Sequence, residues 1–219
     1  MKKKLIINLL DLFAPNSCYF CGKLGDLICE NCFEKQDFEI RMVSKNGKNQ
    51  PDREFYISER SGILKRMVDD LKFKNKKENA LFLAQILAQA LAKNPIFLQA
   101  QKEIILLPVP TSSRHIRQRG FDHTELISKN LAKILEIRKQ KTIIRKADFV
   151  QRGASKTVRF EQAAQSYDLA AKIEKQAIYC VLDDIRTTGA TLNSISQTLK
   201  RNGAREVWAI YLMQQKQQK

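Results

Sequence analysis

The stretch that most constrains the fold is 179–191, which reads YCVLDDIRTTGAT. It begins inside a run of six apolar residues, 177–182, that stops at Asp183 and Asp184. Such an unbroken run is typical of a strand buried on both faces of a parallel sheet. Beyond a short polar loop, apolar residues recur at helical spacing over 192–199. The stretch therefore predicts an α/β fold with a mainly parallel sheet flanked by helices.

The loop between this strand and helix has the chemistry of a phosphate site. Backbone N–H groups at the start of a helix bind anions, and a glycine lets the backbone approach them closely. The predicted phosphate-binding residues are Thr187, Thr188, Gly189, Ala190 and Thr191. Asp183 and Asp184 would accept hydrogen bonds from two sugar hydroxyls, and charged acceptors make such bonds strong. The alternative is an ordinary strand end, but the spacing DDxxTTGxT favours a ribose 5-phosphate site.

Four of the five cysteines lie close together near the N-terminus, in two CxxC pairs: Cys18, Cys21, Cys29 and Cys32. Four thiolates at this spacing suit a tetrahedral structural zinc ion. Redox pairs and disulfides are the alternatives, and they are disfavoured because no βαβ pattern surrounds the cysteines. The fifth, Cys180, falls inside the apolar strand, where we expect an inert core residue.

The chain is strongly basic, with a formal net charge of +16 over 219 residues. Nucleic acid, an anionic membrane surface or a polyphosphate ligand would suit that charge, and the alternative is a lysine-rich bias spread over the surface. No apolar run reaches the ~18 residues that span a bilayer. Residues 5–13 are predicted to form a short amphipathic helix without a cleavage site, so we expect a cytoplasmic protein.

The remaining pattern predicts a small N-terminal module, a linker and one larger domain. The boundaries are 1–40 for the module, 41–53 for a linker rich in turn residues, and 54–219 for the α/β domain. Within that domain, apolar periodicity predicts strands and helices. The strands are 54–58, 103–108, 142–145 and 206–213, and the helices are 62–73, 78–92 and one that starts near 126.

Two basic stretches are candidates for binding anions. The first contains Lys72, Lys74, Lys76 and Lys77, which would contact phosphates or form a solvated helix junction. The second follows a strand and contains Pro110, Thr111, Arg114, Arg117 and Arg119, and its arginines would clamp phosphate oxygens. Phe73 and Phe121 lie within these stretches, where they would stack on bases or belong to the core.

With these motifs in place, nearly the whole chain resembles the ComF competence-protein family. The thirteen residues 179–191 are similar to the signature by which type I phosphoribosyltransferases bind 5-phosphoribosyl 1-pyrophosphate (PRPP). The other shared motifs are the four cysteines, LKFK at 71–74, PVP at 108–110 and RxRGF at 117–121. The resemblance implies a type I phosphoribosyltransferase-like domain joined to a four-cysteine zinc module.

Four positions depart from the family pattern. Arg186 replaces an aliphatic residue within the signature, and Ala163 stands where asparagine is common. Asp122 and His123 follow the RxRGF motif in place of Asn and Gln. The charge of Asp122 would weaken an anion clamp, and His123 is predicted to be a surface residue at a helix start.

The resemblance implies PRPP binding with Mg2+, with a link to DNA uptake or nucleotide metabolism. One hypothesis is a phosphoribosyltransferase in which a nitrogen nucleophile displaces pyrophosphate. A second is a binding protein for single-stranded DNA that acts with other DNA-uptake proteins and reuses the fold. A third is PRPP sensing without transfer. The sequence identifies no acceptor base, no catalytic residue and no oligomeric state.

Overall fold

The computed structural model describes residues 16–146 and 166–215. It divides the chain into two compact units, Met1–Asp37 and Phe38–Lys219. The described part of the first unit, from residue 16 on, contains the four clustered cysteines and the helix α2 (Glu30–Glu34). The helix predicted at 5–13 lies outside the described residues.

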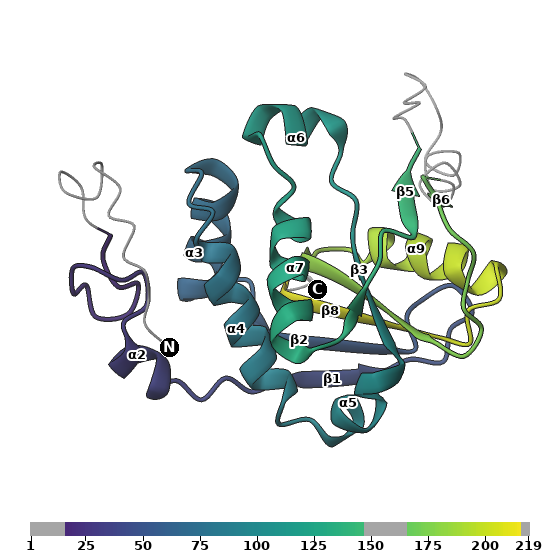
Figure 1. Ribbon diagram of the computed structural model, residues 1–219, viewed down its shortest axis with the longest axis horizontal. Helices are drawn as coiled ribbons and strands as arrows, with labels where there is room; N and C mark the ends of the chain where they lie inside the picture. Colours follow the sequence, from purple (N-terminus) through teal and green to yellow (C-terminus); the bar gives the residue numbers. More distant parts are fainter. Residues whose placement is uncertain (1–15, 147–165, 216–219) are drawn as a thin grey trace. The chain divides into compact units, whose positions relative to one another are not determined.

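A six-stranded sheet organises the second unit, in the order β1-β2-β8-β7-β3-β4 (Figure 1). Its strands are β1 (Arg41–Ser44), β2 (Arg53–Glu59), β3 (Ile104–Pro108), β4 (Arg138–Lys139), β7 (Ile178–Arg186) and β8 (Glu206–Gln214). Strand β1 runs antiparallel to β2, and the other four pairings are parallel. The prediction of an α/β fold with a mainly parallel sheet is confirmed.

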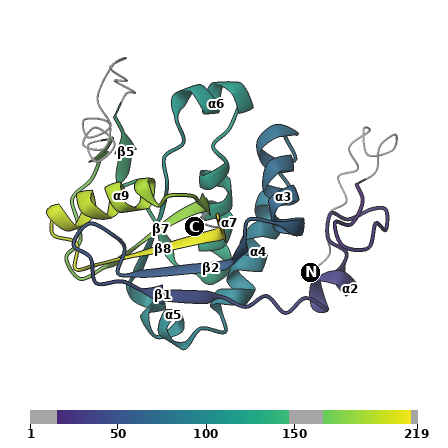
Figure 2. The same ribbon diagram turned by 180° about the vertical axis from the view of Figure 1, so that it is seen from behind.

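Helices cover both faces of this sheet (Figures 1 and 2). Helix α9 (Ala190–Arg201) packs on one face. The other helices are α3 (Gly62–Phe73), α4 (Asn79–Leu91), α5 (Pro95–Ala100), α6 (Ser113–Arg119) and α7 (His123–Leu135), with a 3-10 turn η1 (Gln101–Glu103). A separate two-stranded ribbon pairs β5 (Ile143–Arg145) with β6 (Tyr167–Leu169).

Strand β7 shows why the sequence forms these layers. Its side chains alternate between the two faces. Tyr179 and Val181 belong to the core cluster formed with Leu192 and Ile195 of α9. Cys180 is fully buried, and burial raises the pKa of its thiol, so it is the inert core residue that the sequence predicted.

The segment predicted as a linker lies within the second unit. Residues Arg41–Ser44 form β1, whose backbone pairs with β2. The turn residues that follow, 45–52, connect the two strands, because Lys45 N–H donates to Asp52 O at 2.8 Å. The sequence analysis therefore identified the turn at 45–52. This turn closes the hairpin between β1 and β2 instead of separating two domains.

Among the described residues, no single helix is long and apolar enough to cross a membrane. Helix α4 and the segment Pro95–Glu103, which are bent by 100° relative to each other, pass the criteria of length and composition only as a pair.

Candidate functional site

The candidate site lies where β3 and β7 end. These strands are parallel neighbours, and Pro108 pairs with Leu182, so the loops that follow them leave the sheet at the same edge. One loop leads to α6, and the other leads through Asp183 and Asp184 to α9. The motifs PVP and DDIRTTGAT, about 75 residues apart in the sequence, are therefore adjacent in the fold.

Asp184 is the centre of this site. It is 4% exposed, and both of its carboxylate oxygens are engaged. Oδ2 forms an ion pair with Lys72 Nζ at the end of α3, and Oδ1 lies 3.2 Å from His123 Nε2 at the start of α7. Burial alone would raise the pKa of Asp184, but the hydrogen bond from His123 and the charge of Lys72 outweigh it and hold the pKa below its ordinary value.

His123 is not the surface residue that the sequence predicted. It is the first residue of α7, but it is 6% exposed. A carboxylate only accepts hydrogen bonds, so Nε2 donates to Asp184. Arg119 Nη1 lies 3.3 Å from Nδ1 and only donates, so Nδ1 is the acceptor. One neutral tautomer satisfies both neighbours and connects Arg119 to the acid pair.

Asp183 is placed differently from its neighbour. It is partly exposed, and its Oδ1 accepts the backbone N–H of Asp184 at 2.9 Å. Partial burial and the negative charge of Asp184 raise the pKa of Asp183. Of the two acids predicted to meet the ribose hydroxyls, Asp183 is the one with free accessible surface, whereas Asp184 is engaged within the protein.

The two basic stretches meet above this edge of the sheet. The Arg119 guanidinium lies 5.5 Å from the centre of the Phe73 ring, and Lys77 Nζ lies 5.1 Å from that of Phe121. Phe73 is 73% exposed, whereas Phe121 is 9% exposed and belongs to the core. The ammonium group of Lys72 is bound by the buried Asp184, whereas Lys74 and Lys76 form ion pairs with Asp70 at 2.9 Å and 3.6 Å.

Asp122, a departure from the family pattern, caps α7. Its Oδ1 accepts hydrogen bonds from the Glu125 N–H at 3.2 Å, from the Thr124 hydroxyl at 2.7 Å and from the Thr111 hydroxyl at 2.9 Å. Burial opposes ionisation, but these bonds lower the pKa of Asp122. The Asp122 carboxylate is thus neutralised in part by the donors of the helix cap and does not oppose the arginines of α6. It also fixes the position of the Thr111 side chain.

The predicted phosphate loop lies open at the start of α9. Thr187 and Thr188 are exposed, and Ala190 begins the helix with its N–H donating to the Thr188 hydroxyl at 3.3 Å, while the N-cap residue Gly189 has no capping side chain. Gly189 has φ +81°, and a Cβ there would lie 2.7 Å from Nη2 of Arg186. Only glycine suits this position, because of both the left-handed backbone and the close side chain.

Arg186 is held beneath this loop by a buried acid. Its Nε forms an ion pair of 3.1 Å with Glu54 Oε2, and Glu54 is 2% exposed. Glu54 also accepts hydrogen bonds from Lys45 Nζ at 2.6 Å and from the Tyr211 hydroxyl at 2.8 Å. This explains the departure from an aliphatic residue, since Glu54 compensates the charge of Arg186.

The other predicted anion-binding residues line a cavity of about 450 Å3 between the β3–α6 loop and β5. Its polar lining includes Thr111, Arg114, Arg117, Arg145 and Lys146. The sequence analysis missed Arg145 and Lys146 as anion-binding residues, because Arg145 ends a short strand and Lys146 begins an unremarkable basic segment after it. No acidic residue appears among the described residues of this lining, so the cavity suits an anion.

In the first unit, the four clustered cysteines fit a zinc site. Their sulfurs all lie within 4.8 Å of one another. Cys21 Sγ and Cys29 Sγ are 3.7 Å apart, close to the ~3.8 Å edge of a tetrahedron with Zn–S bonds of about 2.3 Å. None of the five cysteines forms a disulfide. Gly22, at φ +76°, allows the turn in which its N–H donates to Cys18 O at 2.9 Å.

Comparison with known proteins gives several curated relatives that cover most of the chain, including a DNA utilization protein and a competence protein. DNA utilization protein YhgH of Salmonella typhimurium is 31% identical over 203 residues, which is 88% of this chain and 82% of the relative. Competence protein F of Haemophilus influenzae is 28% identical over 206 residues, 87% of this chain and 83% of the relative. The chain therefore belongs to the ComF family, which includes competence protein F and YhgH.

Two other comparisons add nothing to this assignment. No model of a protein family matches the chain. A hypoxanthine phosphoribosyltransferase from Staphylococcus aureus overlaps 63% of this chain and 64% of its own, at 15% identity and a TM-score of 0.38. At that TM-score we base no statement about the fold on the overlap.

The first prediction concerns the N-cap that Asp122 forms on α7. Asp122→Ala should lower the free energy of unfolding by about 1–2 kcal/mol, because the start of α7 loses its acceptor. Since the pKa of Asp122 is lowered in the folded chain, this contribution is present above about pH 3.9 and disappears as the pH falls through the folded pKa. Urea unfolding at pH 7 and pH 3 measures both effects, and Asp122→Asn, which keeps an acceptor, is the control. An equal loss at the two pH values would contradict the role of the charge.

Proposed function

We propose that this chain binds PRPP at the loop between β7 and α9. The observation that carries the proposal is the arrangement of the two acids: Asp184 is bound by Lys72 and His123, and Asp183 remains partly exposed. The Asp183 carboxylate provides acceptors for a sugar diol, and the helix start beside it, whose N-cap residue is Gly189, provides N–H donors for a phosphate. This combination is what a ribose 5-phosphate requires.

The residues have distinct roles in this proposal. Thr187, Thr188 and the N–H groups that follow Gly189 hold the 5-phosphate, and Asp183 accepts from the ribose hydroxyls. Asp184 is a positioning residue, because its own oxygens are occupied. Arg114 and Arg117, across the same edge of the sheet, approach the pyrophosphate. Mg2+ would enter with PRPP and neutralise the pyrophosphate oxygens.

Transfer would require little further chemistry from the protein. A nitrogen nucleophile would form a C–N bond at the anomeric carbon while the C–O bond to pyrophosphate breaks and pyrophosphate leaves with the electron pair. The protein would contribute positioning and stabilisation of the leaving group. The proposal concerns PRPP binding, and release of pyrophosphate in the presence of a free base distinguishes transfer from sensing.

A second function, binding of single-stranded DNA, is favoured by one surface feature. Phe73 is 73% exposed next to the Arg119 guanidinium, in a stretch that also contains Lys74, Lys76 and Lys77. Exposed aromatic rings among cations bind single strands without sequence preference, by stacking and by phosphate contacts. The name of the relative YhgH, DNA utilization protein, is consistent with this second function.

We also propose that Cys18, Cys21, Cys29 and Cys32 bind one structural zinc ion. The separation of their sulfurs and the absence of disulfides among the described cysteines support it. A segment this short has little apolar core of its own, so metal binding would supply much of its folding free energy.

PRPP binding is tested by substituting Asp183 and Asp184 one at a time. At pH 9, above the raised pKa of about 8, Asp183→Asn should reduce PRPP affinity about tenfold or more, because it weakens charged hydrogen bonds worth roughly 1.5–3 kcal/mol each, and it should not lower the stability. Asp184→Asn should instead lower the unfolding free energy by about 3–5 kcal/mol, since it leaves Lys72 without its buried partner. Calorimetry with PRPP and Mg2+ and urea unfolding measure the two effects. Should Asp183→Asn and Gly189→Val both bind PRPP like the parent, this loop is not the ligand site.

DNA binding is tested by salt dependence and by stacking. Replacing Lys74, Lys76 and Lys77 with Gln should lower the slope of log affinity against log salt by about 0.7 for each phosphate that these lysines neutralise. Phe73→Ala should cost about 1–3 kcal/mol of binding if one base stacks there. Phe121→Ala is unsuitable because that ring is buried. Lys129→Gln with Lys133→Gln, on exposed positions of α7, is the charge control. An unchanged affinity for oligodeoxythymidylate in all variants rules this surface out.

The zinc proposal is tested by measuring the metal content of the protein. Freshly purified, reduced protein should contain about one zinc per chain, and Cys29→Ser should lose it while the second unit stays folded. Cys180→Ala, which removes the core thiol, should retain the metal. Metal analysis by mass spectrometry and circular dichroism measure these outcomes, and a zinc-free parent protein would be incompatible with a structural zinc site.

A further inference from the structure

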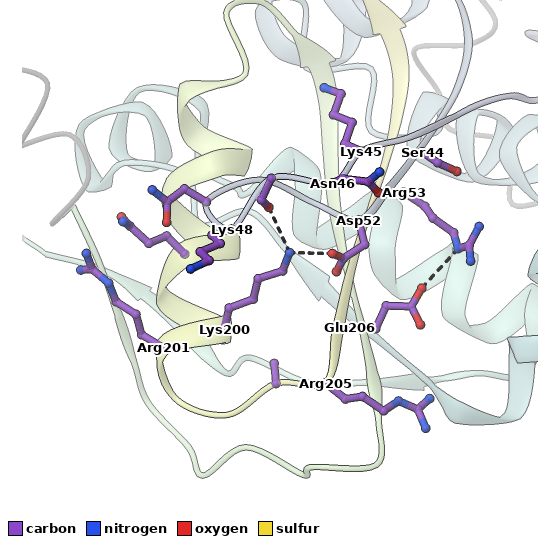
Figure 3. Close-up of a pocket in the computed structure, with 14 residues that line it drawn as sticks. Ser44, Lys45, Asn46, Lys48, Asp52, Arg53, Lys200, Arg201, Arg205 and Glu206 are labelled. Carbon is purple, nitrogen blue, oxygen red and sulfur yellow. Dashed lines mark hydrogen bonds and ion pairs between the residues drawn. The ribbon is translucent and has the colours of Figure 1, made fainter.

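A second cavity, of about 730 Å3, lies at the opposite edge of the sheet (Figure 3). The turn between β1 and β2, the last turn of α9 and the starts of β2 and β8 surround it. Glu206, in its lining, pairs with Ile178, which precedes Asp183 by five residues on β7. At about 3.3 Å per residue, the cavity is roughly 17 Å from the acid pair along the strand. It is therefore distinct from the PRPP loop.

This cavity concentrates positive charge beyond what the composition of the chain explains. Six of its 14 lining residues are Lys or Arg, compared with 39 of 219 in the whole chain. The six are Lys45, Lys48, Arg53, Lys200, Arg201 and Arg205. The acids in the lining are Asp52 and Glu206. The cluster thus carries an excess of four positive charges.

The wall of the cavity is preformed by hydrogen bonds. Lys200 Nζ donates to Gln50 O at 2.9 Å and to Asp52 Oδ1 at 2.7 Å, which ties α9 to the β1–β2 turn. Asp52 Oδ2 accepts the Val207 N–H at 2.8 Å, which ties the same turn to β8. A ligand would therefore meet a shape that is already fixed, and little ordering would oppose binding.

Both acids of the lining are already engaged. Asp52 binds Lys200, and Glu206 Oε1 accepts from Arg53 Nε at 3.2 Å and from the indole of Trp208 at 2.5 Å. Carboxylates outside the lining hold two further cations: Glu54 holds Lys45 at 2.6 Å, and Glu103 holds Arg205 at 2.5 Å. Each of these four cations has a partner.

Lys48 and Arg201 are different. Both are exposed, and neither has an ion pair or a side-chain hydrogen bond within the part of the chain that the structure describes. Their side chains lie on the same side of the cavity, with Lys48 between Arg201 and Lys200 (Figure 3). Among the described residues no carboxylate compensates either of these two charges, so both are available to an anion.

We propose that this cavity is a second anion-binding site that holds a phosphate-bearing ligand through Lys48 and Arg201. A guanidinium binds two phosphate oxygens at once, and an ammonium adds a point charge. The volume is within the roughly 300–1,000 Å3 of small-molecule sites. Three amide side chains in the lining, Asn46, Asn49 and Gln197, would bind uncharged groups of the ligand.

The end of α9 does not oppose such a ligand, although free carbonyls at a helix end repel anions. Here Thr198 O accepts from Asn202 Nδ2 at 2.8 Å, and Leu199 O accepts from Ala204 N–H at 3.1 Å. Lys200 O accepts from Gly203 N–H at 3.1 Å. These carbonyls are thus satisfied before an anion approaches.

The phosphate could come from either of two sources, a small phosphorylated molecule or the backbone of a nucleic acid strand. Inorganic pyrophosphate and oligodeoxythymidylate are the two probes, and calorimetry measures both in the full chain. Lys48→Gln with Arg201→Gln should weaken at least one of them about tenfold. For the oligonucleotide, the salt slope should also fall by about 1.4, since the variant neutralises two fewer phosphates at ~0.7 each. Weaker binding of pyrophosphate alone identifies a small ligand, and weaker binding of the oligonucleotide alone identifies a strand.

Two controls separate this site from general charge and from the PRPP loop. Lys129→Gln with Lys133→Gln also removes two positive charges, here from exposed positions of α7, and should change the affinity for neither probe. Gly189→Val, which disturbs the loop at the other edge, should keep the binding that depends on Lys48 and Arg201. Unchanged binding of both probes by the double variant, or an equal loss of affinity in the control, overturns the proposal. Thermal unfolding confirms that each variant is folded.

Discussion

The buried carboxylate of Asp184 is the constraint on which the arrangement of the site depends. A carboxylate at 4% exposure is costly unless it is paired and hydrogen-bonded. Its partners, Lys72 and His123, come from the end of α3 and the start of α7. Satisfying one acid therefore fixes two helix ends against the edge of the sheet. It also leaves the neighbouring Asp183 at the surface, with a raised pKa.

The same constraint organises the basic surface above the acids. His123 accepts from Arg119, and Arg119 lies on the ring of Phe73, which is the residue next to Lys72. Together with Asp184 these residues form a closed chain of contacts. It runs from Lys72 through Asp184, His123 and Arg119 to Phe73, the residue next to Lys72. In this arrangement the exposed Phe73 and the acid pair are parts of one structure, so a ligand that moves Arg119 would also alter the environment of His123. The two proposed ligands, PRPP and a single strand, would thus act on connected residues.

The sequence predicted the parts of the site that are local and missed those that depend on tertiary contacts. The apolar run of β7, the loop and α9 follow one another, so periodicity and spacing identified them. The contacts of Asp184 join residues 61 and 112 positions apart, and no local pattern reports such pairs. Helix α6 has seven residues and an almost wholly polar sequence, and β1 is mostly exposed, so neither has a strong hydrophobic period. One signal was available for His123: Asp122 is a favourable N-cap, and it places the histidine in the first turn, facing the strand ends.

Glu54 connects the two edges of the sheet. Lys45, which lines the basic cavity, and Arg186, which lies beneath the phosphate loop, both depend on this one carboxylate. At 2% exposure Glu54 requires positive partners, because an uncompensated buried charge is strongly destabilising. The Tyr211 hydroxyl also donates to Glu54. The buried acid thus links the β1–β2 turn, through Lys45, to the residue beneath the phosphate loop, Arg186.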